Sequence, residues 1–141
     1  MSDSKMISRS PVVKDLVLIG GGHTHVEVLR SFGMRPVPGV RITLVSRDIH
    51  TPYSGMLPGY VSGFYNYDDC HIDLGRVTTF AKARFIHEEA VGIDIQSRRI
   101  LFQNRPSIPY DLLSINVGIT PAASLVPGAK EHTTPVKPID K

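Results

Sequence analysis

The chain has 141 residues, a formal net charge of +3 and 41% hydrophobic residues, a composition that predicts one globular domain of ordinary size. Its Lys and Arg residues are scattered with little aromatic interleaving, which argues against nucleic-acid binding. No apolar run approaches the ~20 residues that a membrane span requires. Cys70 is the only cysteine, so an internal disulfide is excluded and a reducing compartment such as the cytoplasm is expected.

The first candidate site lies where a strand meets a run of glycines. Residues 1–13 are polar and are expected to form a disordered lead-in. Residues 14–19 form a predicted strand, apolar enough to be buried on both faces of a parallel sheet. Gly20–Gly22 and an amphipathic segment follow at once. This order predicts a strand, a tight turn and a helix, in which backbone N–H groups and the helix dipole meet a pyrophosphate.

The glycines of this turn have separate expected roles. Gly20 would let the chain turn sharply and Gly22 would let a phosphate approach the backbone, because neither carries a Cβ atom. His25 occupies the third position of the G-x-G-x-x-G pattern, where glycine usually lets the helix pack closely on the strand. A histidine there requires a wider gap or a side chain that points outward. Glycine-rich turns also occur in α/β proteins that bind no dinucleotide, so the nucleotide site is a hypothesis.

The next elements complete a strand–helix–strand unit. The helix is expected to place Val26, Leu29 and Phe32 on one face and to stop at Gly33. A connection with two prolines and a glycine leads to a second strand over 40–45, which is rich in β-branched residues.

The end of this second strand commonly carries an acidic residue that accepts hydrogen bonds from the adenosine ribose. Here Ser46 can hydrogen-bond a ribose but supplies no charge. Arg47 could meet a 2′-phosphate or a diphosphate. Plain NAD is therefore not indicated, and an NADP(H)-binding domain is a second candidate.

Residues 49–67 are crowded with prolines, glycines and aromatic residues, with polar hydroxyls between them. One interpretation is a surface loop with short helical turns that is packed by its own aromatic side chains. The other is a wall for a flat ligand, in which small residues permit close approach and polar groups orient the ligand. The sequence leaves both open.

The remaining chain contains one further helix and several strands. The helix is predicted over 69–83 and a strand over 84–87. A hairpin of 91–95 and 99–102 follows, and then a buried strand over 110–118 that ends on glycine. The candidate core residues of the helix are Ile72, Val77, Phe80 and Ala81.

The histidine, cysteine and serine residues do not form a recognisable metal or nucleophile motif. His23 and His25 lie two residues apart and Cys70 precedes His71, but neither spacing matches a zinc signature, so no metal is predicted. Cys70 has no C-x-x-C partner, which excludes a dithiol relay within the chain. Ser54 lacks the G-x-S-x-G frame of a hydrolase elbow.

Several separated segments occur in a familiar order. The glycine turn, the strand 42–45, the hairpin and the segment 110–121 follow one another as in the FAD-containing pyridine nucleotide-disulfide oxidoreductase superfamily. The last segment resembles that superfamily's Y-D-x-L-x-x-A-T-G-x-x-P motif, with Asn116-Val117-Gly118 in place of Ala-Thr-Gly. More narrowly, 20–29, 51–59 and 70–74 look like the NADH-dehydrogenase-like flavoprotein region that is often fused to selenide, water dikinase.

The resemblance implies a Rossmann-like, three-layer α/β domain that binds FAD, with a parallel sheet and a β-hairpin or meander insertion. In the intact protein, hydride would pass from NADH to the flavin and on to an acceptor. Gly20 and Gly22 would hold the pyrophosphate, Ala90 would approach the adenine through its backbone, and 52–56 would lie towards the flavin. The residues that the resemblance assigns to the cofactor are Gly20, Gly22, His23, Thr24, Ser46, Arg47, Pro52, Tyr53, Ser54, Gly55, Met56, Ala90 and Gly118.

In this superfamily an NADH-binding domain interrupts the FAD domain, and a C-terminal segment completes it. Residues 14–128 would form the N-terminal part of the FAD-binding domain, and 129–141 the crossover towards an NADH-binding domain. The chain is therefore expected to be a fragment that is not catalytic alone, and self-association or docking to those domains is plausible. A non-catalytic interaction module that keeps the fold is the third candidate.

Overall fold

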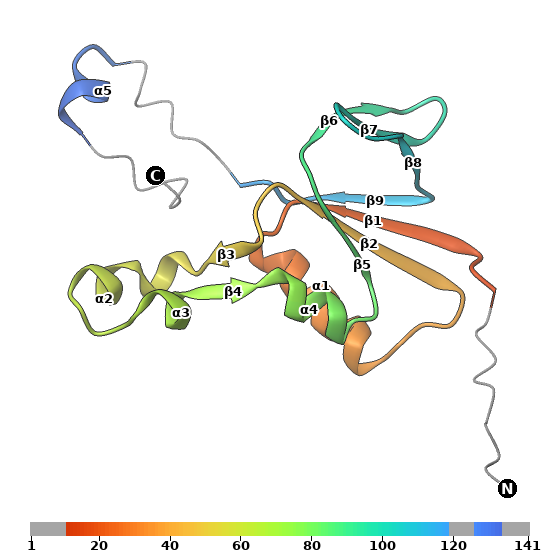
Figure 1. The fold of residues 1–141 in the computed structure, drawn as a ribbon, viewed down its shortest axis with the longest axis horizontal. Coiled ribbons are helices and arrows are strands. Elements are labelled where there is room, and N and C mark those ends of the chain that lie inside the picture. Colours follow the sequence, from red (N-terminus) through yellow and green to blue (C-terminus); the bar gives the residue numbers. More distant parts are fainter. Residues whose placement is uncertain (1–10, 119–125, 134–141) are drawn as a thin grey trace, which may run out of the picture.

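A parallel sheet forms the centre of the molecule in the computed structural model, which describes residues 11–118 and 126–133 (Figure 1). Its strands lie in the order β5, β2, β1, β9, and each neighbouring pair is parallel. The predicted ranges of β1, β2 and β5 are confirmed to within one residue, whereas β9 is shorter than the predicted strand over 110–118. The bounds are Lys14–Ile19 (β1), Val40–Ser46 (β2), Arg84–His87 (β5) and Leu112–Ile115 (β9).

Two hydrophobic cores lie on the two faces of this sheet. The side chains of β1 alternate between them: Val17 and Ile19 belong to one core, and Leu18 to the other. Helices α1 (His23–Met34) and α4 (Leu74–Phe80) cover the Leu18 face, and a small antiparallel sheet covers the opposite face (Figure 1). These layers confirm the predicted α/β architecture, and the burial of β1 on both faces is confirmed as well.

The antiparallel sheet is a meander of three strands, β6, β7 and β8. Ile100, Phe102 and Ile108 from this meander pack into the core against the parallel sheet. The predicted hairpin is confirmed, with its first arm displaced by one residue, while the third strand was not predicted because it has only two residues. The bounds are Ala90–Asp94 (β6), Arg99–Phe102 (β7) and Ile108–Pro109 (β8).

Helix α1 packs on the sheet through the face that the sequence predicted. Leu29 is fully buried, and Val26 and Phe32 pack against the same core. The helix continues one residue beyond the predicted stop at Gly33. A Cβ atom at Gly33 would lie 2.3 Å from the ring of Phe80, so this glycine allows α1 and α4 to approach closely.

The predicted helix over 69–83 is wrong at its start. Residues 67–73 form a short helix, α3 (Tyr67–Cys70), and a strand, β4 (His71–Asp73), and α4 begins only at Leu74. The reason is the Asp73 carboxylate, which accepts a hydrogen bond of 3.1 Å from the Arg76 backbone N–H and caps the new helix.

The predicted core residues of this helix need two corrections. Ile72 lies on β4, before the helix begins, and is only half-buried. Phe80 was expected in the core, but 54% of it is exposed, and its ring covers Gly33 instead. Leu74 and Thr78 are the buried residues of α4. Val77 and Ala81 are partly buried and pack against the core, which agrees with the prediction.

A lobe of residues 50–73 extends from the sheet (Figure 1). Its base is the antiparallel pair of β3 (His50–Pro52) with β4, and the chain between them forms a 3-10 turn η1 (Ser54–Met56), α2 (Leu57–Val61) and α3. A Cβ atom at Gly59 would lie 2.5 Å from the Tyr65 ring. This packing is that of a loop with short helical turns held by its own aromatic side chains, the first of the two interpretations.

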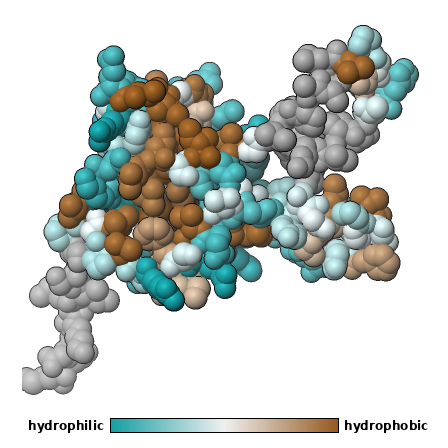
Figure 2. All heavy atoms as spheres, turned by 180° about the vertical axis from the view of Figure 1, so that it is seen from behind, coloured by the Kyte–Doolittle hydropathy of each residue, from teal (hydrophilic) through white to brown (hydrophobic). Residues whose placement is uncertain are grey.

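Part of the surface is hydrophobic. Figure 2 shows hydrophobic residues gathered in a band across the sheet-bearing body and again on the lobe. On the lobe, Val61 is 78% exposed and Phe64 81% exposed. No helix within residues 11–118 and 126–133 is both long and apolar enough to cross a membrane.

The structure describes only part of the predicted lead-in (1–13) and of the predicted crossover (129–141). Residues 11–13 are exposed, and the Val13 N–H donates to the Gly39 carbonyl at 2.8 Å. Helix α5 (Ala129–His132) begins the predicted crossover. The predictions for 1–10 and 134–141, and for the motif positions 119–121, lie outside the described residues.

Candidate functional site at the carboxyl edge of the sheet

The carboxyl ends of the four parallel strands meet at one edge of the sheet. From β1 the chain adds β2 and then β5 on one side, and later returns to add β9 on the other side of β1. The strand order therefore reverses between β1 and β9. In open α/β sheets, ligands bind outside the carboxyl ends of the strands at such a reversal point.

Gly20 lies directly at this reversal point. Its φ angle is +94°, and a Cβ atom would lie 2.1 Å from the backbone oxygen of Asn116, just beyond β9. The Gly20 N–H donates to the Val45 carbonyl of β2 at 2.8 Å, and the Asn116 N–H donates to the Ile19 carbonyl at 2.8 Å. The turn thus lies between backbones from both neighbouring strands, and only glycine fits it.

Gly22 precedes the first residue of α1. A Cβ atom there would lie 2.4 Å from the side-chain nitrogen of Asn116, and the Gly22 N–H donates to the Asn116 carbonyl at 3.3 Å. Sequence reasoning did not count Asn116 among the site residues. The one available signal was its place in the segment that resembles the superfamily's A-T-G motif, where the asparagine replaces alanine.

The helix begins without a side-chain cap. No side chain of the described residues accepts a hydrogen bond at this end, and the first turn of α1 holds no acidic residue. Thr24, in that first turn, is exposed. Uncapped N–H groups and the positive end of the helix dipole favour an anion at this place.

His25 overturns the expectation of an outward side chain, one of the two alternatives for a histidine at this position, whereas the wider gap stays a prediction. It is fully buried and points into the protein, with Nδ1 2.7 Å from the Gly20 carbonyl oxygen and Nε2 2.8 Å from the Ser114 hydroxyl of β9. Burial lowers the pKa of His25, and the hydrogen bond to the Gly20 carbonyl offsets part of that change. The imidazole is therefore neutral at pH 7.

The loop expected on the flavin side reaches the same end of the helix. The ring of Tyr53 meets the ring of His23 edge to face, with centroids 4.9 Å apart. The His23 Nε2 atom is buried and has no hydrogen-bond partner among the described residues. A hydrogen bond of 2.7 Å from the Tyr53 N–H to the Cys70 carbonyl fixes the segment 52–56 to the neighbouring chain. The structure therefore brings the glycine turn and this loop together.

The two residues expected near the ribose follow β2 at the same edge. Ser46 is buried, and its hydroxyl donates to the Asp48 carbonyl at 2.9 Å while accepting from the Asp48 N–H at 3.2 Å. It lies beside the turn, 3.4 Å from the position of a Cβ atom on Gly21. Arg47 is exposed and forms an ion pair of 3.1 Å with the Asp48 carboxylate.

Ala90 and Gly118 are the two remaining residues that the resemblance assigns to the cofactor. Ala90, at the start of β6, packs against the core between the two sheets. Gly118 has a φ angle of +77°, and a Cβ atom there would have no neighbour within 4 Å in the described structure.

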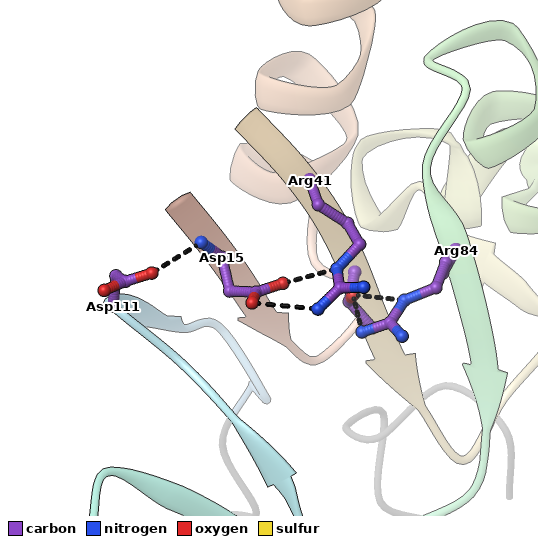
Figure 3. Close-up of polar contacts among 5 residues, drawn as sticks. Asp15, Arg41, Arg84 and Asp111 are labelled. Atoms are coloured by element: carbon purple, nitrogen blue, oxygen red, sulfur yellow. Dashed lines mark hydrogen bonds and ion pairs between the residues drawn. The ribbon is translucent and has the colours of Figure 1, made fainter. Parts of the chain in front are cut away.

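Charged side chains gather at the opposite, amino edge of the sheet (Figure 3). The Arg41 guanidinium donates two hydrogen bonds to the Asp15 carboxylate, at 2.6 and 2.9 Å, which raises the pKa of Arg41. The Asp15 N–H donates to the Asp111 carboxylate at 2.7 Å. Arg84 donates to the Thr43 hydroxyl at 3.0 and 2.8 Å. These contacts tie all four parallel strands or their immediate flanks together.

Cys70 is a packed thiol. It is buried, and burial together with the nearby Asp69 carboxylate raises the pKa of its thiol, so the reactive thiolate is disfavoured. Within the described ranges, no group of three or more His, Cys, Asp and Glu residues is placed to hold a metal ion.

Comparison with known proteins finds relatives among oxidoreductases. The chain is 32% identical over 134 residues to the NADH dehydrogenase-like protein YutJ of Bacillus subtilis, a match that covers 92% of this chain and 36% of YutJ. The chain thus spans about a third of that relative's length. No protein-family model matches it.

Solved structures show the same fold. The sulfide:quinone oxidoreductase of Aquifex aeolicus superposes with a TM-score of 0.73 at 26% identity, over 86% of this chain and 28% of that enzyme. NDH2 of Plasmodium falciparum, also solved in complex with NADH, superposes with a TM-score of 0.66 at 18% identity, over 84% of this chain and 25% of NDH2. These matches confirm the Rossmann-like class of the fold.

Proposed function

We propose that this chain forms the FAD-binding half-domain of an NADH-dependent flavin oxidoreductase. The observation that carries the proposal is the glycine turn at the reversal point of the sheet, where Gly20 lies between two backbones and α1 begins with uncapped N–H groups. A pyrophosphate is the ligand group that this arrangement fits best, because it offers negative charge to backbone donors that no side chain occupies.

The comparisons support this function at a coarser level. They include an NADH dehydrogenase-like protein and NDH2 solved in complex with NADH. The structural neighbours are FAD-containing NAD(P)H oxidoreductases, which is consistent with FAD and NADH as cofactors. When bound, the flavin supplies the hydride chemistry. In this chain Gly20, Gly22 and the first turn of α1 would hold the pyrophosphate, and the segment 52–56 would approach the flavin.

The finer features are also part of the proposal. Hydride transfer from NADH would need parts beyond this half-domain, which is proposed to dock with them or with a second copy. The roles of Ser46, Arg47, Ala90 and Gly118 and the fusion with selenide, water dikinase stay predictions. A cytoplasmic location is proposed because the only cysteine, Cys70, is a free thiol.

The direct test is FAD titration of the purified chain and of the Gly22→Glu variant. Binding is measured by calorimetry and by the visible absorbance that the protein retains after desalting. We expect the variant to lose FAD binding, because the glutamate adds bulk and negative charge where the pyrophosphate would lie. Ser31→Glu is the matched control, since it places the same charge on an exposed position of the same helix and should bind FAD like the native chain.

Each outcome distinguishes the candidates. FAD affinity that Gly22→Glu leaves unchanged would overturn the assignment of the turn. A preference for NADP(H) that disappears in Arg47→Ala would favour the NADP(H)-binding domain. A native chain that is colourless and gains no thermal stability from FAD, NADH or NADPH would favour the non-catalytic interaction module.

A further inference from the structure

We propose that His25 and Ser114 form a positioning pair that holds the glycine turn in the conformation that receives the dinucleotide. The proposal rests on the proposed function and adds residues that the glycine motif does not contain. His25 stands where the motif has its third glycine, and Ser114 lies on β9, 89 residues further along the chain.

The hydrogen bonds define the proton positions of the pair. A carbonyl oxygen can only accept, so the Nδ1 atom of His25 carries the proton that is donated to Gly20 at 2.7 Å. The imidazole is neutral, so its Nε2 atom accepts, and the Ser114 hydroxyl donates to it at 2.8 Å. The Gly20 carbonyl therefore selects the tautomer, and the Ser114 hydroxyl supplies the donor that the Nε2 atom of this tautomer requires.

The bond to Gly20 also determines where the next amide points. A peptide unit is planar and trans, so the Gly20 carbonyl and the Gly21 N–H point in opposite directions. The carbonyl is held inward by a buried ring, which directs the Gly21 N–H away from that ring. Without this bond, the peptide unit between the two glycines can rotate, because Gly20 lacks a Cβ atom that would restrict it.

The pair also links the three elements that make the site. His25 belongs to α1, Gly20 follows β1, and Ser114 pairs in register with Leu18 of β1 across the reversal point. In the usual motif the third glycine brings helix and strand together by having no side chain. Here a histidine fills that interface, and its two polar contacts replace close packing by a hydrogen-bonded bridge.

The test compares Ser114→Val with Ser114→Thr by FAD titration of the full chain. The two side chains have nearly the same shape and the same branching, and only threonine keeps the hydroxyl. We expect Ser114→Val to bind FAD about tenfold more weakly than the native chain, the factor that corresponds to one hydrogen bond of ordinary strength. Ser114→Thr should stay within about threefold of the native affinity, which corresponds to a small fraction of that bond.

A second readout separates this proposal from the proposed function. In NMR spectra without FAD, the amide signals of Gly21 and Gly22 should move in Ser114→Val and stay in place in Ser114→Thr. If the native chain fails to bind FAD, the proposed function fails, and these signals alone decide the positioning role. Equal FAD affinities of the two variants, or unmoved glycine signals in Ser114→Val, would overturn the pair. Should Ser114→Val not fold, the smaller Ser114→Ala takes its place in both measurements.

Discussion

The two edges of the parallel sheet are built from opposite chemistry. At the amino edge, the Asp15 and Arg41 side chains form an ion pair with two hydrogen bonds. At the carboxyl edge, the contacts around Gly20 are made by backbone groups, a neutral imidazole and a hydroxyl. Charge thus connects the strands where no ligand is expected. Uncharged groups surround the glycine turn at the other edge, where the Arg47–Asp48 ion pair is exposed beyond β2. The first turn of α1 holds no acidic side chain that would compensate the positive end of its dipole.

The largest loss of stability at the carboxyl edge is expected from a substitution of Gly20. We expect Gly20→Ala to lower the free energy of unfolding by about 3 kcal/mol or more, because the methyl group would meet the Asn116 backbone at a positive φ angle. Gly63→Ala is the control, since Gly63 has a φ angle of +78° but no neighbour within 4 Å of the added atom. Its loss should be about 1 kcal/mol. Equal losses in urea unfolding would mean that the Asn116 contact has no effect.

The amino edge should respond less strongly to the loss of its ion pair. Arg41→Ala leaves the Asp15 carboxylate, whose side chain is only 15% exposed, without its charged partner. We expect a loss of about 1–2 kcal/mol in the free energy of unfolding, between the values for exposed and for buried pairs. Arg30→Ala removes an exposed pair with Glu27 and should cost less than about 0.5 kcal/mol. Equal effects of the two changes in denaturant unfolding would contradict this ranking.

The smallest expected difference between the edges is their response to acid. The pKa of His25 is lowered by burial, so the unfolded chain binds the proton more tightly, and stability should decline as the pH falls below about 6.5. The pKa of Asp111 is lowered by the hydrogen bond from the Asp15 N–H, so its contribution should be lost only as the pH falls below about 3.8. Melting temperatures should show the first decline diminished in His25→Gln and the second in Asp111→Asn. A His25→Gln profile parallel to that of the native chain would show that His25 does not titrate on unfolding.

Sequence patterns predicted the regular parts of the fold well. β1 and β2 each contain four consecutive apolar or β-branched residues, over 16–19 and 42–45, and β5 has Phe85 and Ile86 at its centre. Burial in a parallel sheet selects for such segments. β4, α3 and β8 were missed because they have three, four and two residues, too few for a periodicity to appear. Asp73 is a residue type that favours the N-cap position, and it marks the true start of α4 at Leu74.

Only the part of the candidate site that is formed by neighbouring residues could be predicted from the sequence. The glycine turn follows from neighbouring residues, because tight turns need glycine at defined places. The inward direction of His25 does not, since its partner lies 89 residues away on β9. Asn116 is similar: the segment around it matched a family motif, but its contact with the glycine turn depends on the pairing of β9 with β1.

That long separation has a consequence for the order of folding. The glycine turn is synthesised early, but the strand that completes its surroundings follows about ninety residues later, and closing so large a loop is slow compared with forming local structure. A nascent chain therefore carries its nucleotide motif without a complete site around it until about ninety further residues have been added. A dinucleotide that binds only after β9 has docked beside β1 would stabilise the docked state, and the free energy gained would rise with the logarithm of the dinucleotide concentration. The supply of cofactor would therefore affect how much of the chain stays folded.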